Sequence, residues 1–309
     1  MSLSYSHTKE SDPSRFVRTR ERLEALLATH RQPWLLDAQV TEPHWRWGLL
    51  RRCAVSVDPE QLFQAQMASD DAATSHFGLL VDELSRVLSS PAGRFLEDAA
   101  LQLPGSLGTI APLLTVLGRH PLLRGLTLAG REAEFGVRFE EAPTITRWRL
   151  TGVPISPATL MPRSLEHLEL IDTPLFPGAE ELLAAPAPSL ELLGLTDDHL
   201  EVARLLHRLT PATHPKLRRL RLSDDLADGV MVALAESPLL RQLELLQFHG
   251  PFTDIGLDAV LKAAARFSRI PKLSFTGGSA SGSLKRMAYK QLPQLELPTK
   301  RPVVAWTGW

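Results

Sequence analysis

The sequence predicts an α/β solenoid. In this fold a curved parallel β-sheet forms the concave side, and helices with 3₁₀ or extended segments form the convex side. Two observations support the prediction. An apolar triplet recurs along the chain, with its second member three residues after the first and its third member two residues later. Several triplets are then followed by a glycine and a segment with the apolar spacing of a helix.

The triplets predict the strands. Side chains alternate between the two faces of a strand, so the last two members of a triplet face the core together and the residue between them faces the concave side. From Leu123 to Ile270, successive triplets begin 20 to 30 residues apart. The clear copies are Leu123/Leu126/Leu128, Ile145/Trp148/Leu150, Leu165/Leu168/Leu170, Leu190/Leu193/Leu195, Leu217/Leu220/Leu222 and Leu240/Leu243/Leu245, with further matches at Ile270/Leu273/Phe275, Leu50/Cys53/Val55 and Leu96/Ala99/Leu101.

The pattern resembles the strand signature of leucine-rich repeats, whose period is about 20–29 residues. Across residues 120–275 the chain is similar to the ribonuclease-inhibitor type, because Asp254-Ile255-Gly256 is followed by a helical pattern. The asparagine that usually closes the strand in this family is missing. Three prolines between Leu150 and Leu165 predict an extended or 3₁₀ convex segment. The resemblance implies a fold and does not specify a function.

The chain divides into four predicted parts. Residues 1–48 are a polar tail and a helical N-terminal cap, with a helix start at Asp12-Pro13. Residues 49–120 are irregular N-terminal repeats, similar to the companion region found ahead of some bacterial leucine-rich repeats. Residues 121–276 are the leucine-rich repeats. Residues 277–309 are a Gly/Ser linker and a C-terminal cap or tail, in which Trp306 and Trp309 either cover the last repeat or contact a partner.

Composition narrows the classes of function. The net charge of -1 gives no general attraction to nucleic acid or to an anionic membrane. A single cysteine excludes an intrachain disulfide and fits a reducing compartment. The sequence shows no apolar run of about 18 residues and no signal-peptide pattern near its start. We therefore expect a cytoplasmic monomer that contacts neither membrane nor nucleic acid.

Candidate catalytic chemistry is sparse. Cys53 occupies a core position of its triplet, where a free thiol packs as a small apolar group. Asp197, Asp198 and His199 fit solvated turn residues better than a metal site, since the histidines lack ligand spacing. We predict no catalytic residue, no metal and no cofactor.

The predicted concave face carries the candidate site. Its exposed strand positions are rich in charge, and two interpretations stay open. The arginines are anchors that dock a protein partner, or they form cross-strand pairs with the acids and keep an open sheet soluble. The candidate binding residues are Arg147, Arg149, His167, Glu169, Arg219, Arg221, Gln242 and Glu244.

We predict a non-catalytic scaffold that binds a protein partner on this face. Two alternatives belong to other classes. One is an enzyme or effector whose active site lies in the N-terminal 120 residues. The other is binding of nucleic acid or another anionic ligand through the basic C-terminal segment. From Lys285 onward this segment contains five basic residues and one acidic residue, Glu296.

Overall fold

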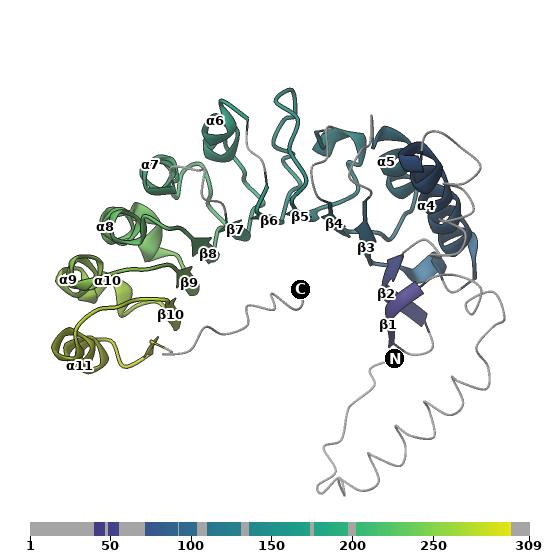
Figure 1. Cartoon of the computed structure of the whole chain (residues 1–309). Helices are drawn as coiled ribbons and strands as arrows, with labels where there is room; N and C mark the ends of the chain where they lie inside the picture. Colours follow the sequence, from purple (N-terminus) through teal and green to yellow (C-terminus); the bar gives the residue numbers. More distant parts are fainter. Residues whose placement is uncertain are drawn as a thin grey trace, which may run out of the picture.

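The chain forms an arc of stacked repeats, with a β-sheet along its inner side and helices along its outer side (Figure 1). The computed structural model describes residues 40–46, 49–55, 72–91, 93–103, 110–130, 136–173, 176–196 and 202–297. Within these residues one sheet holds eleven strands in chain order, β1 to β11. The predicted leucine-rich-repeat solenoid is confirmed.

Ten of the eleven strands run parallel. β1 (Val40–Arg46) pairs antiparallel with β2 (Leu49–Val55), and from β2 onward every neighbouring pair is parallel. The others are β3 (Asp98–Gln102), β4 (Gly125–Ala129), β5 (Arg147–Thr151), β6 (His167–Ile171), β7 (Leu192–Thr196), β8 (Arg219–Ser223), β9 (Leu245–His249), β10 (Lys272–Thr276) and β11 (Leu295–Glu296).

The triplets build a continuous core because they stack in register. Leu126, Trp148, Leu168, Leu193 and Leu220 are aligned on successive strands, and each is 0% exposed. The indole of Trp148 remains hydrogen-bonded inside this core, since its N–H donates to the carbonyl of Ile145 at 3.2 Å. The two early triplets predicted in β2 and β3 take the same place in the stack.

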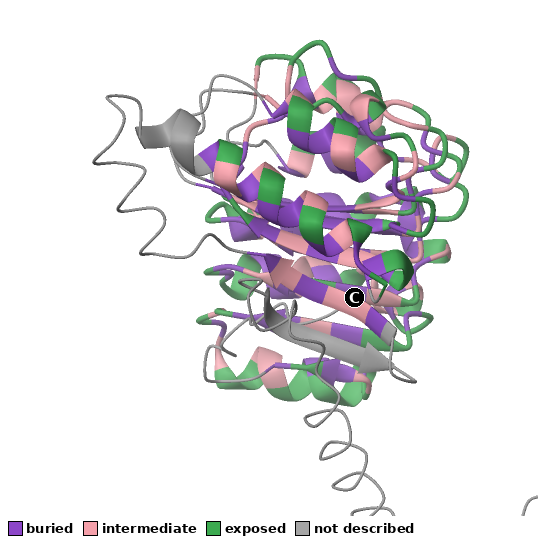
Figure 2. Ribbon diagram, turned by 90° about the vertical axis from the view of Figure 1, so that its right-hand side faces the viewer, coloured by how far each residue is buried: buried purple, intermediate pink, exposed green. Residues whose placement is uncertain are grey.

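The convex side carries helices whose inner faces are buried and whose outer faces are exposed (Figure 2). No helix of the described ranges is long and apolar enough to cross a membrane. The connection between β5 and β6 is extended, as its prolines predict. The helices are α4 (Ala72–Ser89), α5 (Ala111–Gly118), α6 (Ala179–Ala184), α7 (Val202–Arg208), α8 (Ala227–Glu236), α9 (Asp254–Lys262), α10 (Ala264–Phe267) and α11 (Gly282–Gln291), with 3₁₀ turns η1 (Gly93–Phe95), η2 (Phe139–Glu141) and η3 (Pro238–Arg241).

The N-terminal end of the sheet differs from the prediction. A helical cap was expected within residues 1–48, but residues 40–46 form the antiparallel strand β1. This strand supplies hydrogen-bond partners to the edge of β2 that would otherwise be bare. The helix expected at Asp12-Pro13 lies outside the described residues.

The register of β9 also corrects the sequence analysis. The core triplet of this repeat is Leu243/Leu246/Phe248, and not Leu240/Leu243/Leu245, because Leu246 pairs with Leu220 and Phe248 with Leu222. Both triplets fit the same spacing. The 3₁₀ turn η3, which Ser237 caps by accepting a hydrogen bond from the Leu239 amide, takes up the residues before the strand and selects the later triplet.

The C-terminal segment is more ordered than a linker. Residues 277–297, which lie within the predicted Gly/Ser linker and C-terminal cap or tail, form another repeat that consists of α11 and the short strand β11. A further triplet, Leu292/Leu295/Leu297, is buried there and escaped the sequence analysis. Residues 298–309, with Trp306 and Trp309, lie outside the described part of the chain.

The corrected register makes a direct prediction about stability. Phe248→Ala removes a side chain that is 1% exposed, and we expect it to lower the free energy of unfolding by about 3–5 kcal/mol. Leu245→Ala removes a half-buried side chain that faces away from the core, and we expect a loss below about 1 kcal/mol. Urea denaturation measures both, and the reverse order would contradict the register.

Candidate functional site

The concave face presents mainly positive charge. Outward-facing positions of β2–β10 include six basic and two acidic side chains, although the whole chain has a net charge of -1. Positive charge is therefore concentrated on the inner side of the arc shown in Figure 1. The basic residues are Arg52, Arg147, Arg149, Arg219, Arg221 and Lys272, and the acidic residues are Asp98 and Glu169.

Glu169 lies at the centre of this face between two arginines. Arg221 Nη1 donates to Glu169 Oε1 at 2.5 Å, and Arg149 Nε lies 3.8 Å from Oε2 of the same carboxylate. Arg221 is on β8 and Glu169 on β6, so the bond passes over β7. It can do so because the residue between them is Gly194, where a Cβ would lie 2.9 Å from Glu169 Cγ.

A second contact of the same design lies on the three preceding strands, β3 to β5. Arg147 on β5 reaches over β4 to Asp98 on β3, with Nη2 2.8 Å from Oδ1. The intervening residue is Gly125, where a Cβ would lie 1.8 Å from the same Asp98 oxygen. Burial raises the pKa of Asp98 above its ordinary value, and Arg147 opposes this rise. In both contacts an arginine, a glycine and an acid occupy neighbouring strands in register.

The acids are covered by the arginines that bind them. Side-chain exposure is 4% for Glu169 and 16% for Asp98, against about 20% for each bound arginine, Arg147, Arg149 and Arg221. Burial lowers the pKa of the Arg149 guanidinium, with the charges of Arg221 and Arg52 adding to this effect. An arginine nevertheless stays protonated in a protein. A molecule inside the arc therefore meets guanidinium groups.

His167 lies beside these contacts and is neutral. Arg219 Nη2 donates to His167 Nε2 at 3.2 Å, so this ring nitrogen carries no proton. Burial lowers the pKa of His167 from 6.5 to about 4, and the charges of Arg219, Arg147 and Arg221 add to the effect. Its 4.0 Å approach to Glu191 is therefore not an ion pair at neutral pH.

Residues at or just before the starts of the strands, together with Arg51 in β2, form a rim of mixed charge. Arg51 pairs with Glu97, Arg218 lies 3.9 Å from Glu244, and Glu191 lies 3.6 Å from Arg219. A shallow depression of about 480 Å³ opens at this rim, lined by Glu191, Lys216, Arg218, Arg219 and Glu244. The basic centre of the concave face is thus bordered by a rim that carries several carboxylates.

The structure brings together six of the eight predicted binding residues. Arg147 and Arg149 lie on β5, His167 and Glu169 on β6, and Arg219 and Arg221 on β8, so that only β7 separates them. Gln242 and Glu244 do not lie on a strand, because β9 begins at Leu245. Gln242 instead donates to the carbonyls of His214 and Leu217.

The outward positions of β9 are Leu245, Gln247 and His249. Asp98 was missed as a site residue, although its outward position follows from the predicted triplet Leu96/Ala99/Leu101. The bridging role of Gly125 and Gly194 has no signal within a single repeat, and it appears only when neighbouring repeats are aligned.

Of the remaining candidate residues, the structure describes Cys53. Cys53 is buried, and burial raises the pKa of its thiol to about 12. It therefore packs as a small apolar side chain. Among the described residues no group of three or more His, Cys, Asp or Glu side chains is placed to hold a metal ion. Asp197, Asp198 and His199 lie outside the described residues.

Comparison with known proteins supports the fold. A protein of Bacteroides fragilis of known crystal structure matches with a TM-score of 0.56 and 17% identity, over 81% of this chain and 73% of that one. A leucine-rich-repeat protein of Leptospira interrogans matches with a TM-score of 0.39 and 16% identity, over 71% of this chain and 57% of that one. The likeness in fold rests on the first. No protein-family model and no curated protein sequence matches the chain.

The neutral state of His167 predicts how stability depends on pH. Below 6.5 the unfolded chain binds a proton at this histidine, whereas the folded chain resists it down to about pH 4. As the pH falls from 6.5 to 4, the free energy of unfolding should therefore decrease. This histidine should contribute up to about 3 kcal/mol to the decrease. His167→Gln cannot titrate, and its denaturation curves should shift less between pH 7 and 4. Equal shifts in both proteins would contradict the assignment.

Gly194 should be intolerant of a side chain. We expect Gly194→Ala to lower the free energy of unfolding by about 1–3 kcal/mol, because the added methyl overlaps Glu169 and forces it away from Arg221. The control is Gly229→Ala within α8, where a Cβ meets nothing within 4 Å. That change should be neutral or stabilising, since alanine favours a helix. Similar behaviour of the two variants in thermal denaturation would contradict a close approach at Gly194.

Proposed function

We propose that the chain is a non-catalytic binding scaffold whose concave face holds a protein partner with an acidic surface. The observation that carries the proposal is the imbalance of charge on this face. Six basic side chains point into the arc, while the two acids among them are covered by arginines. A partner that supplies carboxylates would neutralise this excess of positive charge.

The chemistry of arginine favours such a partner. The planar guanidinium pairs with carboxylates through two parallel hydrogen bonds, and arginine is enriched in protein interfaces. Arg147, Arg149 and Arg221 are already oriented by Asp98 and Glu169. Side chains that are fixed before binding lose less conformational entropy when a partner arrives. The contacts within the sheet and a docking role are therefore compatible.

A protein fits this surface better than a nucleic acid. Nucleic-acid affinity depends on many phosphate contacts made along a continuous basic surface. Here the basic centre is bordered by Glu97, Glu166, Glu191 and Glu244, which lie just before the strands. These carboxylates would repel an extended polyanion that crossed the rim. A folded partner can place its acidic groups over the centre and other groups at the rim.

Affinity capture followed by titration tests the proposal. The concave variant carries Arg219→Glu and Lys272→Glu, which change partly exposed side chains and leave the contacts of Arg147, Arg149 and Arg221 intact. The control variant carries Arg163→Glu and Arg241→Glu, which change the same charge at exposed sites outside the concave strands. We expect a partner captured by the native chain to bind the concave variant at least about tenfold more weakly and to bind the control normally.

Circular dichroism and thermal melting establish that both variants fold. Added salt should weaken the native complex, because opposite charges attract less strongly when screened. Equal affinity of the partner for the native chain and the concave variant would contradict the proposal.

A further inference from the structure

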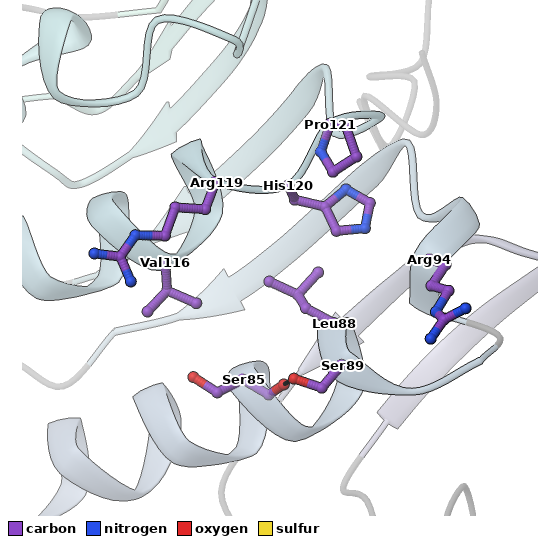
Figure 3. A pocket seen from close by; sticks show the side chains of 8 residues that line it. All are labelled: Ser85, Leu88, Ser89, Arg94, Val116, Arg119, His120 and Pro121. Carbon is purple, nitrogen blue, oxygen red and sulfur yellow. Dashed lines mark hydrogen bonds between the residues drawn. The ribbon is translucent and has the colours of Figure 1, made fainter.

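A separate pocket lies between α4, η1 and α5, away from the concave strands (Figure 3). Its volume is about 490 Å³, within the range of about 300–1,000 Å³ that is typical of small-molecule sites. None of the residues discussed under the proposed function contributes to it. The lining residues are Ser85, Leu88, Ser89, Arg94, Val116, Arg119, His120 and Pro121.

One side of the pocket is held by a chain of hydrogen bonds. Ser90 Oγ donates to the Val87 carbonyl at the end of α4 and accepts from the Gly93 amide. The Gly93 carbonyl then accepts from His120 Nε2 at 3.0 Å. His120 Nδ1 accepts from the Leu123 amide at 3.1 Å, so the proton of the neutral ring lies on Nε2. These bonds join α4, η1 and the turn before β4 in one wall.

Both nitrogens of His120 are therefore engaged within the protein. Protonation of its ring would break the bond from the Leu123 amide, and burial lowers the pKa of His120. The hydroxyls of Ser85 and Ser89 each donate to a carbonyl four residues earlier in α4. These groups shape the pocket, and the serine oxygens can still accept a hydrogen bond. None of them supplies a positive charge to a ligand.

The charge of the pocket comes from two arginines. Arg94 on η1 and Arg119 after α5 are both exposed, and none of the described residues that line the pocket is acidic. Within the described part of the chain neither guanidinium makes a hydrogen bond or ion pair, in contrast to Arg147, Arg149, Arg219 and Arg221 of the concave face. Figure 3 shows the two guanidinium groups on opposite sides, with Leu88 between them. Val116 and Pro121 extend the apolar lining.

We propose that this pocket binds an organic dianion with an apolar middle, of the type of a linear dicarboxylate. Each carboxylate would pair with one arginine, and the hydrocarbon between them would cover Leu88 and Val116. An inorganic anion lacks the apolar part, and a fatty acid of similar length leaves one arginine without a negative charge. Two charges and an apolar link together match the lining.

Isothermal titration calorimetry on the full chain tests this site. The probes are the dicarboxylates succinate, suberate and sebacate, the monocarboxylate octanoate, and inorganic phosphate. We expect one of the dicarboxylates to bind with one-to-one stoichiometry and more tightly than octanoate or phosphate. Arg94→Gln and Arg119→Gln should each weaken that binding at least about tenfold, since each removes one charge-assisted contact. Arg163→Gln, an exposed arginine on the β5–β6 connection, should bind as the native chain does.

Two results would overturn the inference. The first is the absence of dicarboxylate binding to the native chain. The second is binding that survives both arginine substitutions or is equally strong for octanoate. The concave variant Arg219→Glu/Lys272→Glu serves as a further control and should retain dicarboxylate affinity. If this variant loses the protein partner but still binds the dicarboxylate, the pocket is independent of the proposed scaffold function of the concave face.

Discussion

Each repeat of this solenoid carries apolar strand side chains that only its neighbours can bury, and the rest of the structure depends on this constraint. Two apolar side chains on one short strand form a face that remains exposed to solvent until another strand stacks beside it. The copies therefore bury their faces together, from Cys53 in β2 to Phe275 in β10. A shift of one residue would turn every core side chain toward solvent. The strand side chains that face the core thus fix the register of those that face the concave side.

That fixed register explains the concave surface. Outward side chains of successive strands fall into rows, so a residue with no side chain leaves a gap across which its two neighbours can meet. Arg221 meets Glu169 over Gly194, and Arg147 meets Asp98 over Gly125. The arginines are therefore fixed in orientation and largely buried, and they cover the acids to which they bind. The cross-strand pairs and the docking surface are consequently two aspects of one arrangement.

The sequence predicts the architecture well, because core burial leaves a periodic signal that local residues carry. It is less informative where two signals compete. LLRQLELLQF contains two overlapping triplets, and only the 3₁₀ turn at Pro238 decides between them. Residues 277–283 are rich in glycine and serine and therefore predicted a linker. For this reason the triplet that begins at Leu292 was not recognised as part of a further repeat. The ion pairs over glycines join residues 49 and 52 positions apart, so no local pattern reveals them. The pocket likewise joins α4 to the turn before β4.

A double-mutant cycle on Glu169 and Arg221 tests the central claim most directly, because the two residues meet only if β6, β7 and β8 stack in the stated register. Glu169→Gln, Arg221→Gln and the double variant are compared by their free energies of unfolding, with Glu169 and Lys272 as the control pair. We expect a coupling of about 1–3 kcal/mol between Glu169 and Arg221 and almost none for the control. A coupling near zero for Glu169 and Arg221 would contradict the stacked register and the surface built on it.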